Sequence, residues 1–319
     1  MRSPSQAAPR SGAGADWLFR LVTAGAAWLV LILLGGAAAS MAWGGRLAFE
    51  TFGWSFVTST DWNAVSGEFG ALVPIYGTLA TSIIALLIAV PVSIGIALFL
   101  TDIAPRWLRA PIGTAIELLA AIPSIIYGMW GLFVFAPFMA THVEPWLNDR
   151  LGPLPVIGVL FTGPPIGIGL LTASLVLGIM ILPFVTAVAR DVFNAVPTSL
   201  KEAAVALGST RWEILSRVTL PYTRSAIIGA IFLGLGRALG ETMAVTFVLG
   251  NAHDLSASLL MPSNSIAAAI ANEFTEADSD LYRSSLIALA FLLFVVTFLV
   301  LAAAKLMLMR IGRTHGRTH

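Results

Sequence analysis

The chain has 319 residues, of which 57% are hydrophobic and 11% charged, and its mean hydropathy is +0.88. Soluble globular chains are about 25% charged and far less apolar, so this composition excludes a soluble globular protein and indicates an integral membrane protein. The lipid bilayer is therefore an expected partner, and nucleic acid is not. The chain has no cysteine, which excludes disulfides and thiolate metal sites.

The N-terminal part of the chain divides into three predicted segments. Residues 1–16 are rich in Pro, Ser, Gly and Ala and predict a disordered cytoplasmic tail. Residues 17–44 predict the first transmembrane helix, because about 20 apolar helical residues cross a bilayer core of about 30 Å. Residues 45–71 predict an exterior amphipathic segment, whose aromatic side chains are expected to form an interfacial belt: Phe49, Phe52, Trp54, Phe56 and Trp62.

Residues 72–309 hold five further apolar runs and are followed by a basic cytoplasmic tail, 310–319. The runs are 76–101, 111–140, 168–189, 226–250 and 284–309. Six spans in all predict an all-α integral membrane protein. The prolines and glycines of residues 141–166 predict an irregular exterior loop. In the second span, small residues recur on one face, a pattern typical of helix packing: Thr78, Ser82, Ala85, Ala89 and Ser93.

The basic residues predict the orientation. Outside the spans, only Arg46, Arg150 and Arg283 fall on one side, and the other lysines and arginines fall on the opposite side. Cytoplasmic loops carry the excess of Lys and Arg, so both termini are expected in the cytoplasm. The exterior acidic residues in 273–280 fit either a solvated face or a docking surface for an exterior binding protein.

The third span carries a polar stripe formed by Glu117, Ser124 and Gly131, with Tyr127 nearby. Two interpretations stay open for this stripe. Glu117, Ser124 and Tyr127 line a translocation pathway, or Glu117 lies near the cytoplasmic end and pairs with an arginine of a neighbouring subunit.

The longest cytoplasmic loop, 190–225, predicts two short helices joined by a tight turn. Ser199 with Glu202, and Thr210 with Glu213, have the spacing of a capping box at a helix N-terminus. Gly208 is placed to end the first helix in a left-handed conformation, and Pro221 is expected to stop the second.

The first of these helices presents a small face that fits a groove on another protein. Ala203 and Ala204 form the face, and Glu202 and Arg211 are expected at its rim. The alternative is a surface hairpin that only joins two spans. The sequence "EAAVALG", followed after nine residues by "VTLP", resembles the EAA loop of ABC importer permeases, in which Val218 replaces the usual Ile. This resemblance implies that Glu202, Ala203, Ala204 and Gly208 couple the chain to a cytoplasmic ATPase.

Three further segments extend the resemblance over residues 72–309. "IELLAAIPSIIYGMWGLFVFAPF", "GRALGETMAV" and "SIAAAIANEFTEA" resemble the C-type permease of the bacterial phosphate-specific uptake (Pst) system. The resemblance implies the type I ABC importer permease fold, the bacterial inner membrane and transport of inorganic phosphate. It also implies an A-type permease subunit, two copies of an ABC ATPase and an exterior phosphate-binding protein as partners.

No residues are arranged for covalent chemistry. The two lysines, Lys201 and Lys305, lie outside any Walker A pattern, and the four histidines lack metal-ligand spacing. The chain is therefore predicted to be a transport subunit without catalytic residues, metal or cofactor, and ATP hydrolysis is assigned to the partner.

Arg237 and Glu241 are two charges inside the predicted span 226–250. On a continuous helix they lie on one face about 6 Å apart along the axis, next to a GxxxG ridge formed by Gly236 and Gly240. The two charges either form a structural ion pair or line an anion pathway, in which Glu241 competes with phosphate for the guanidinium.

Two other functions stay open. An ABC permease for sulfate or molybdate would share the EAA loop, and an ion-coupled carrier or channel would use Arg237 and Glu241 as a proton relay.

Overall fold

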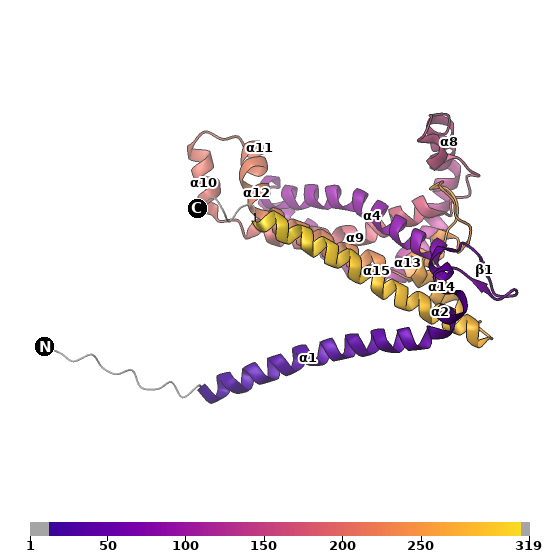
Figure 1. Cartoon of the computed structure of the whole chain (residues 1–319). Coiled ribbons are helices and arrows are strands. Elements are labelled where there is room, and N and C mark those ends of the chain that lie inside the picture. The colour runs from indigo at the N-terminus through magenta and orange to yellow at the C-terminus, as the bar shows by residue number, and fades with distance from the viewer. Residues whose placement is uncertain (1–12, 314–319) are drawn as a thin grey trace.

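The computed structural model of the chain describes residues 13–313. Long helices run side by side, with short helices and the one hairpin gathered at one end and α10 and α11 at the other (Figure 1). Within the described residues, six helical segments are long and apolar enough to cross a membrane: Asp16–Gly44, Leu72–Ile103, Ser124–Leu151, Leu170–Asn194, Arg211–Leu239 and Asp280–Met309. The predicted all-α fold with six spans is confirmed.

The core is built around α4 (Leu72–Leu98) and α9 (Leu170–Asn194). The small residues predicted to pack on the second span are all buried: Thr78, Ser82, Ala85, Ala89 and Ser93. A Cβ at Gly178 of α9 would lie 3.3 Å from the carbonyl oxygen of Ala85, so the two backbones pass close together. Small side chains allow this approach, and dispersion contacts then hold the helices.

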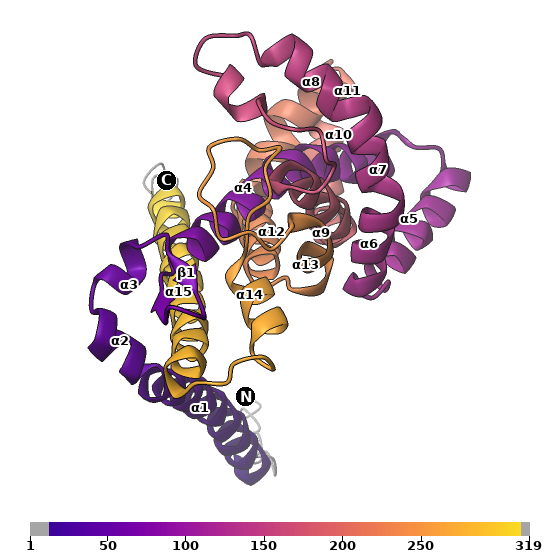
Figure 2. The same cartoon turned by 90° about the vertical axis from the view of Figure 1, so that its right-hand side faces the viewer.

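The first helix, α1 (Ala13–Gly44), diverges from the bundle (Figures 1 and 2). It starts before the predicted boundary, because Ala13 and Ala15 favour helix and Asp16 lies in the first turn, where the helix dipole favours an acid. The other residues of the predicted tail, 1–12, lie outside the described residues. At the C-terminus, α15 (Asp280–Arg313) extends into the predicted tail 310–319, whose last six residues are also outside the described part.

The segment 45–71 folds onto the bundle. It contains α2 (Arg46–Phe52), α3 (Ser55–Thr58) and the antiparallel strands β1 (Trp62–Asn63) and β2 (Glu68–Phe69). Its aromatic rings pack on one another and on α15, and Phe56 is fully buried. Only Trp54 of the predicted belt is strongly exposed, at 85%. The other four rings pack within the chain, because α15 offers an apolar surface to cover, and their place at the membrane interface stays a prediction.

The predicted third span, 111–140, is divided between α5 (Arg106–Ala120) and α6 (Ser124–Trp130), and the third span of the structure begins only at Ser124. Pro123 has no N–H to donate and disfavours helical geometry at the residue before it, so the predicted continuous run 111–140 divides here. The Tyr127 hydroxyl donates to the Leu119 carbonyl oxygen at 2.9 Å and so ties α6 to the end of α5 across the break.

The predicted irregular loop 141–166 is helical in its first part. π-helical turns at Gly131–Phe135 and Met139–Val143, with α7 (Ala136–Phe138) between them, lead into α8 (Glu144–Leu151). A short 3-10 helix follows at Gly158–Phe161. The buried Glu144 carboxylate accepts a hydrogen bond from the Gly167 N–H at 2.8 Å, which ties α8 to the entrance of α9.

The predicted span 226–250 is also interrupted. The helix α12 (Leu220–Leu239) ends before Gly240, and a separate helix, α13 (Met243–Leu249), follows. Gly250 has φ +97°, a conformation that glycine adopts without strain, and it ends α13. The chain then passes through an extended segment into α14 (Ile266–Glu273), which packs against α15.

Candidate coupling loop and translocation site

The loop 190–225 forms the two predicted helices, α10 (Thr198–Ala206) and α11 (Arg211–Ile214), which lie at the end of the bundle opposite the hairpin (Figure 1). Gly208 has φ +84°, so the predicted left-handed end of the first helix is confirmed. The Thr210 hydroxyl accepts from the Glu213 N–H, and the Glu213 carboxylate accepts from the Thr210 N–H. This second capping box is also confirmed.

Two details of the loop prediction are wrong. No side chain caps α10, which begins after Pro197, because the fixed φ of proline favours helix entry two residues earlier than the Ser199 box requires. Pro221 does not end a helix. A π-helical turn at Leu215–Thr219 connects α11 directly to α12, and Pro221 lies in the first turn of α12, where its missing N–H costs little.

The face of α10 that carries the EAA residues is largely uncovered within the chain. Ala204 is buried, whereas Glu202, Ala203 and Gly208 are exposed. The neighbouring Leu207 is 87% exposed. An apolar side chain this exposed on a short helix is available to another protein surface.

An ion pair that the sequence reasoning missed ties this loop to the second span. The Lys201 ammonium lies 2.7 Å from the Asp102 carboxylate, and both side chains are about three-quarters buried. Asp102 belongs to the π-helical turn Phe99–Ile103 at the end of α4. Arg211 and Ile214 line a cavity of about 200 Å³ beside this pair. A force on α10 therefore reaches α4 through a short, partly buried contact. The sequence feature that could have predicted this ion pair is Asp102, an isolated acidic residue in a loop region that is otherwise basic.

Arg237 and Glu241 do not form the predicted helical pair. The i, i+4 spacing requires a continuous helix, but α12 ends at Leu239 and the chain turns at Gly240. Within residues 13–313 no ion pair joins Arg237 to a carboxylate. Glu241 instead accepts a hydrogen bond from the Ala244 N–H at 3.3 Å and thereby satisfies a free donor at the start of α13. The Arg237 side chain is exposed at the chain's own surface.

The α12–α13 junction packs against α6, which brings three predicted pathway residues into one region. A Cβ at Gly128 would lie 2.8 Å from the Met243 carbonyl oxygen, so α6 and α13 are in close contact. The buried Tyr127 lies close enough to Arg237 for a Coulombic interaction. Ser124 begins α6 on the same short helix. Discontinuous helices at a site inside a membrane protein are typical of substrate pathways.

Glu117 does not belong to this region. It lies on α5 and accepts a hydrogen bond from the Arg190 guanidinium of α9 at 2.6 Å. The break at Pro123 separates Glu117 from Ser124, and its arginine partner within the chain is Arg190. Both interpretations of Glu117, as part of a pathway and as a contact with a neighbouring subunit, stay predictions.

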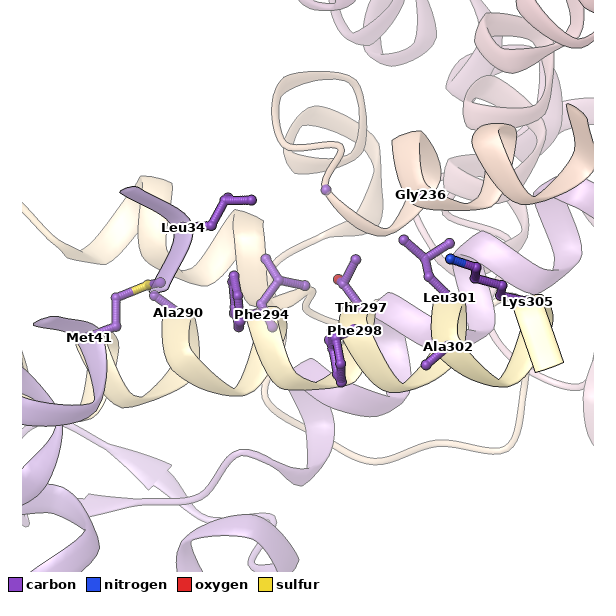
Figure 3. Close-up of a pocket in the computed structure, with 12 residues that line it drawn as sticks. Leu34, Met41, Gly236, Ala290, Phe294, Thr297, Phe298, Leu301, Ala302 and Lys305 are labelled. Atoms are coloured by element: carbon purple, nitrogen blue, oxygen red, sulfur yellow. The ribbon is translucent and has the colours of Figure 1, made fainter. Parts of the chain in front are cut away.

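The predicted packing ridge faces α15 across an apolar groove. Gly236 and Gly240 line this groove of about 840 Å³ between α1, α12 and α15, and Lys305 stands at one end (Figure 3). A Cβ at Gly236 would lie 3.6 Å from Leu301 of α15. The ridge therefore faces α15, as predicted for a packing ridge. The helices α12 and α15 do not pack closely along their whole length, because the apolar groove lies between them.

A polar cluster on the side of the hairpin was missed from the sequence. The Glu273 carboxylate accepts from Trp62 Nε1 at 2.7 Å and from the Tyr282 hydroxyl at 2.6 Å, and it lies 2.9 Å from His253 Nε2. Trp62 stacks on the His253 ring at 5.2 Å. Burial alone would raise the pKa of Glu273, but hydrogen bonds from His253, Tyr282 and Trp62 outweigh it and lower that pKa. The predicted acidic face 273–280 is thus partly structural.

Residues 93–313 match the family described as "Binding-protein-dependent transport system inner membrane component". The chain belongs to this family. Among relatives of this transport component, a phosphate transport system permease protein PstC of Xylella fastidiosa (strain Temecula1) is 61% identical over 304 residues, covering 95% of this chain and 94% of the relative. A protein of the same name from Mesorhizobium japonicum is 58% identical over 316 residues, covering 99% and 97%.

Solved structures support the fold of the family. A bacterial ABC transporter that imports the acidic polysaccharide alginate contains a chain with TM-score 0.61 and 20% identity, covering 93% of this chain and 97% of that one. The MetNI methionine ABC transporter contains a chain with TM-score 0.52 and 17% identity, covering 78% and 96%. The present chain therefore has the fold of ABC importer permeases and is a multi-pass membrane protein.

Proposed function

We propose that this chain is the permease subunit of an ATP-driven importer for inorganic phosphate. The observation that carries the proposal is the identity of 58–61% to phosphate permeases over almost the whole of both chains. The chain transports and performs no covalent chemistry. ATP is hydrolysed by a partner subunit, which binds the exposed EAA face of α10.

Mechanically, the coupling loop transmits the partner's motion along two routes. The first is covalent, because α11 continues through a π-helical turn into α12, which ends beside Arg237. The second is the Lys201–Asp102 ion pair to the end of α4. Two copies of the ATPase would act on this chain and on a related A-type permease, and both termini would lie with α10 in the cytoplasm.

Phosphate enters this scheme at the junction of α6, α12 and α13. The guanidinium of Arg237 matches the oxygens of phosphate and offsets the repulsion that an anion meets in a low-dielectric passage. Glu241 lies two residues beyond the end of α12 and lowers the positive potential, so the site releases the ion again. Tyr127 and Ser124 belong to the wall of this pathway. An exterior binding protein delivers phosphate; a related alginate transporter has been solved with its periplasmic protein.

One experiment tests substrate and partner class together. The chain is purified with its co-expressed neighbours and reconstituted in lipid, and ATP hydrolysis is measured with the phosphate-loaded binding protein. We expect phosphate to stimulate hydrolysis and sulfate to have no effect. Equal stimulation by sulfate would replace phosphate with a broader oxyanion class, and uptake that is driven by an ion gradient without any ATPase would contradict the importer proposal.

The contact with the ATPase is tested by crosslinking. The chain has no cysteine, so Ala203→Cys introduces a unique thiol on the EAA face. It should crosslink to the ATPase subunit, whereas Ser66→Cys in the exposed turn of the hairpin should not. A crosslink from Ser66 and none from Ala203 would reverse the proposed orientation.

The role of Arg237 is tested by Arg237→Gln, which removes the charge and keeps a similar length. Phosphate uptake should be lost while the complex still assembles. Arg150→Gln replaces an exposed arginine of α8 and is the matched control, which should retain uptake. Normal uptake by Arg237→Gln would exclude Arg237 from the pathway.

A further inference from the structure

The contact between α5 and α9 brings together two arginines, Arg109 and Arg190, that have no part in the proposed function. On α5, Arg109, Gly113 and Glu117 recur every four residues and so lie on one face of the helix. Arg190 of α9 reaches onto this face, and its Nη2 lies 2.6 Å from the Glu117 carboxylate. A Cβ at Gly113 would lie 2.6 Å from Arg190 Nη1. The absence of a side chain at Gly113 therefore makes room for the guanidinium, one helical turn from Arg109.

A cavity of about 320 Å³ opens beside the two arginines. Its walls are Arg109 and Ala110 of α5, Arg190 and Asn194 of α9, and Leu100 and Thr101 from the end of α4. Since about 10–15 Å³ of such space admits one water, the cavity is large enough for a small oxyanion.

The charges around this cavity leave an excess of positive charge. Arg109 Nε donates to the Ala104 carbonyl oxygen at 2.8 Å, which anchors the side chain, and within residues 13–313 no carboxylate forms an ion pair with it. Glu117 balances Arg190 alone. The nearby acid Asp102 is already paired with Lys201 and also accepts from the Thr101 hydroxyl at 3.1 Å.

We propose that this cavity binds a phosphate-type oxyanion between Arg109 and Arg190. The planar guanidinium fork matches two oxygens of such an anion, and the free terminal nitrogens of Arg109 supply the donors. The Asn194 amide lies in the same wall and adds a further neutral donor. The ligand is either inorganic phosphate or the phosphate group of an anionic lipid, since both present the same oxygens. This site is separate from the pathway at Arg237, so the inference goes beyond the proposed transport step.

Protection of a single thiol tests the proposal without measuring transport. Ala110→Cys places a unique thiol in the cavity wall, and its rate of modification by uncharged N-ethylmaleimide is measured for the full chain in phosphatidylcholine nanodiscs. Replacing chloride by inorganic phosphate at constant ionic strength should slow the reaction by about threefold or more as the site fills. Ala115→Cys, on an exposed position of α5 outside the cavity, is the matched control and should react at an unchanged rate.

The source of the oxyanion is separated by a second arm. Nanodiscs that contain phosphatidylglycerol, without added phosphate, should slow the reaction if the ligand is a lipid headgroup, whereas slowing by phosphate alone identifies the free ion. Either result supports the site if Arg109→Gln or Arg190→Gln removes the protection. The proposal is overturned if the reaction is slowed in neither arm, or if the slowing is still observed in both arginine variants. Loss of uptake in the transport assay does not affect this readout.

Discussion

Removing the Glu273 carboxylate should loosen the exterior segment from the bundle. The carboxylate holds Trp62 of β1, Tyr282 of α15 and His253 of the segment between α13 and α14, all within 2.9 Å. Glu273→Ala leaves these three polar groups without their shared partner. The hairpin is joined to the bundle through this point, so its loss should be felt across elements that are far apart in the sequence.

The magnitude follows from the contacts. A buried donor that loses its partner costs about 1–3 kcal/mol. The Glu273 side chain is 16% exposed, so water can replace part of what is lost, and the lower figure applies to each of the three groups. Their sum is about 3 kcal/mol. At a few degrees for each kcal/mol, the melting temperature should fall by roughly 6–12 °C.

The assay compares thermal unfolding of the purified chain with that of Glu276→Ala. Glu276 is exposed and only three residues away, so its replacement should change stability by at most about 0.5 kcal/mol. Protease cleavage within residues 60–68 should also become faster for Glu273→Ala at temperatures below the melting point. Equal melting temperatures and equal cleavage rates for the two variants would refute the reasoning.

Three further predictions follow from single groups. Hydrogen bonds lower the pKa of Glu273 in the folded chain. The ionised carboxylate therefore stabilises the fold fully above pH 4.5, its ordinary pKa, and this stabilisation is lost as the pH falls through the lower pKa of the folded state. The difference in melting temperature between the native chain and Glu273→Ala should narrow below about pH 4.5. Gly77→Ala places a Cβ against the Asn264 carbonyl oxygen and should cost about 1–3 kcal/mol in thermal unfolding, whereas Gly95→Ala, which meets open space, should not destabilise. Gly208→Val places a β-branched residue at φ +84°, a strained conformation that costs about 1–2 kcal/mol or more. This variant should reduce phosphate-stimulated ATP hydrolysis in the reconstituted complex, whereas the control Gly229→Ala should not.

Features set by local chemistry were predictable from the sequence. The six spans follow from apolar length, the end of α10 from Gly208, and the start of α11 from the Thr210 and Glu213 capping box. Each of these depends on one continuous stretch of the chain and not on a distant partner. The buried small-residue face of α4 was predictable for a similar reason. A periodic stripe of small residues on one span indicates that a helix packs there, although it does not indicate which helix.

Features that depend on tertiary partners were not predictable. The aromatic rings of residues 45–71 were expected at the membrane interface, and their burial depends on α14 and α15, more than 200 residues away. The Lys201–Asp102 and Arg190–Glu117 pairs likewise join distant elements. The prediction for Pro221 was wrong because this proline lies in the first turn of α12, where its missing N–H costs little, and a π-helical turn before it connects α12 to α11.

The failed pairing of Arg237 with Glu241 has a mechanistic consequence. Gly240 follows the end of α12 and places Glu241 just before α13, so within the described residues no carboxylate pairs with the guanidinium. Because an unpaired arginine inside a membrane protein costs about 2.5 kcal/mol or more, its partner must come from another molecule. If a carboxylate of the second permease supplies it, Arg237→Gln should weaken assembly. If the transported anion supplies it, the same substitution should leave assembly intact and remove uptake, and only this second outcome makes the break at Gly240 part of the transport mechanism.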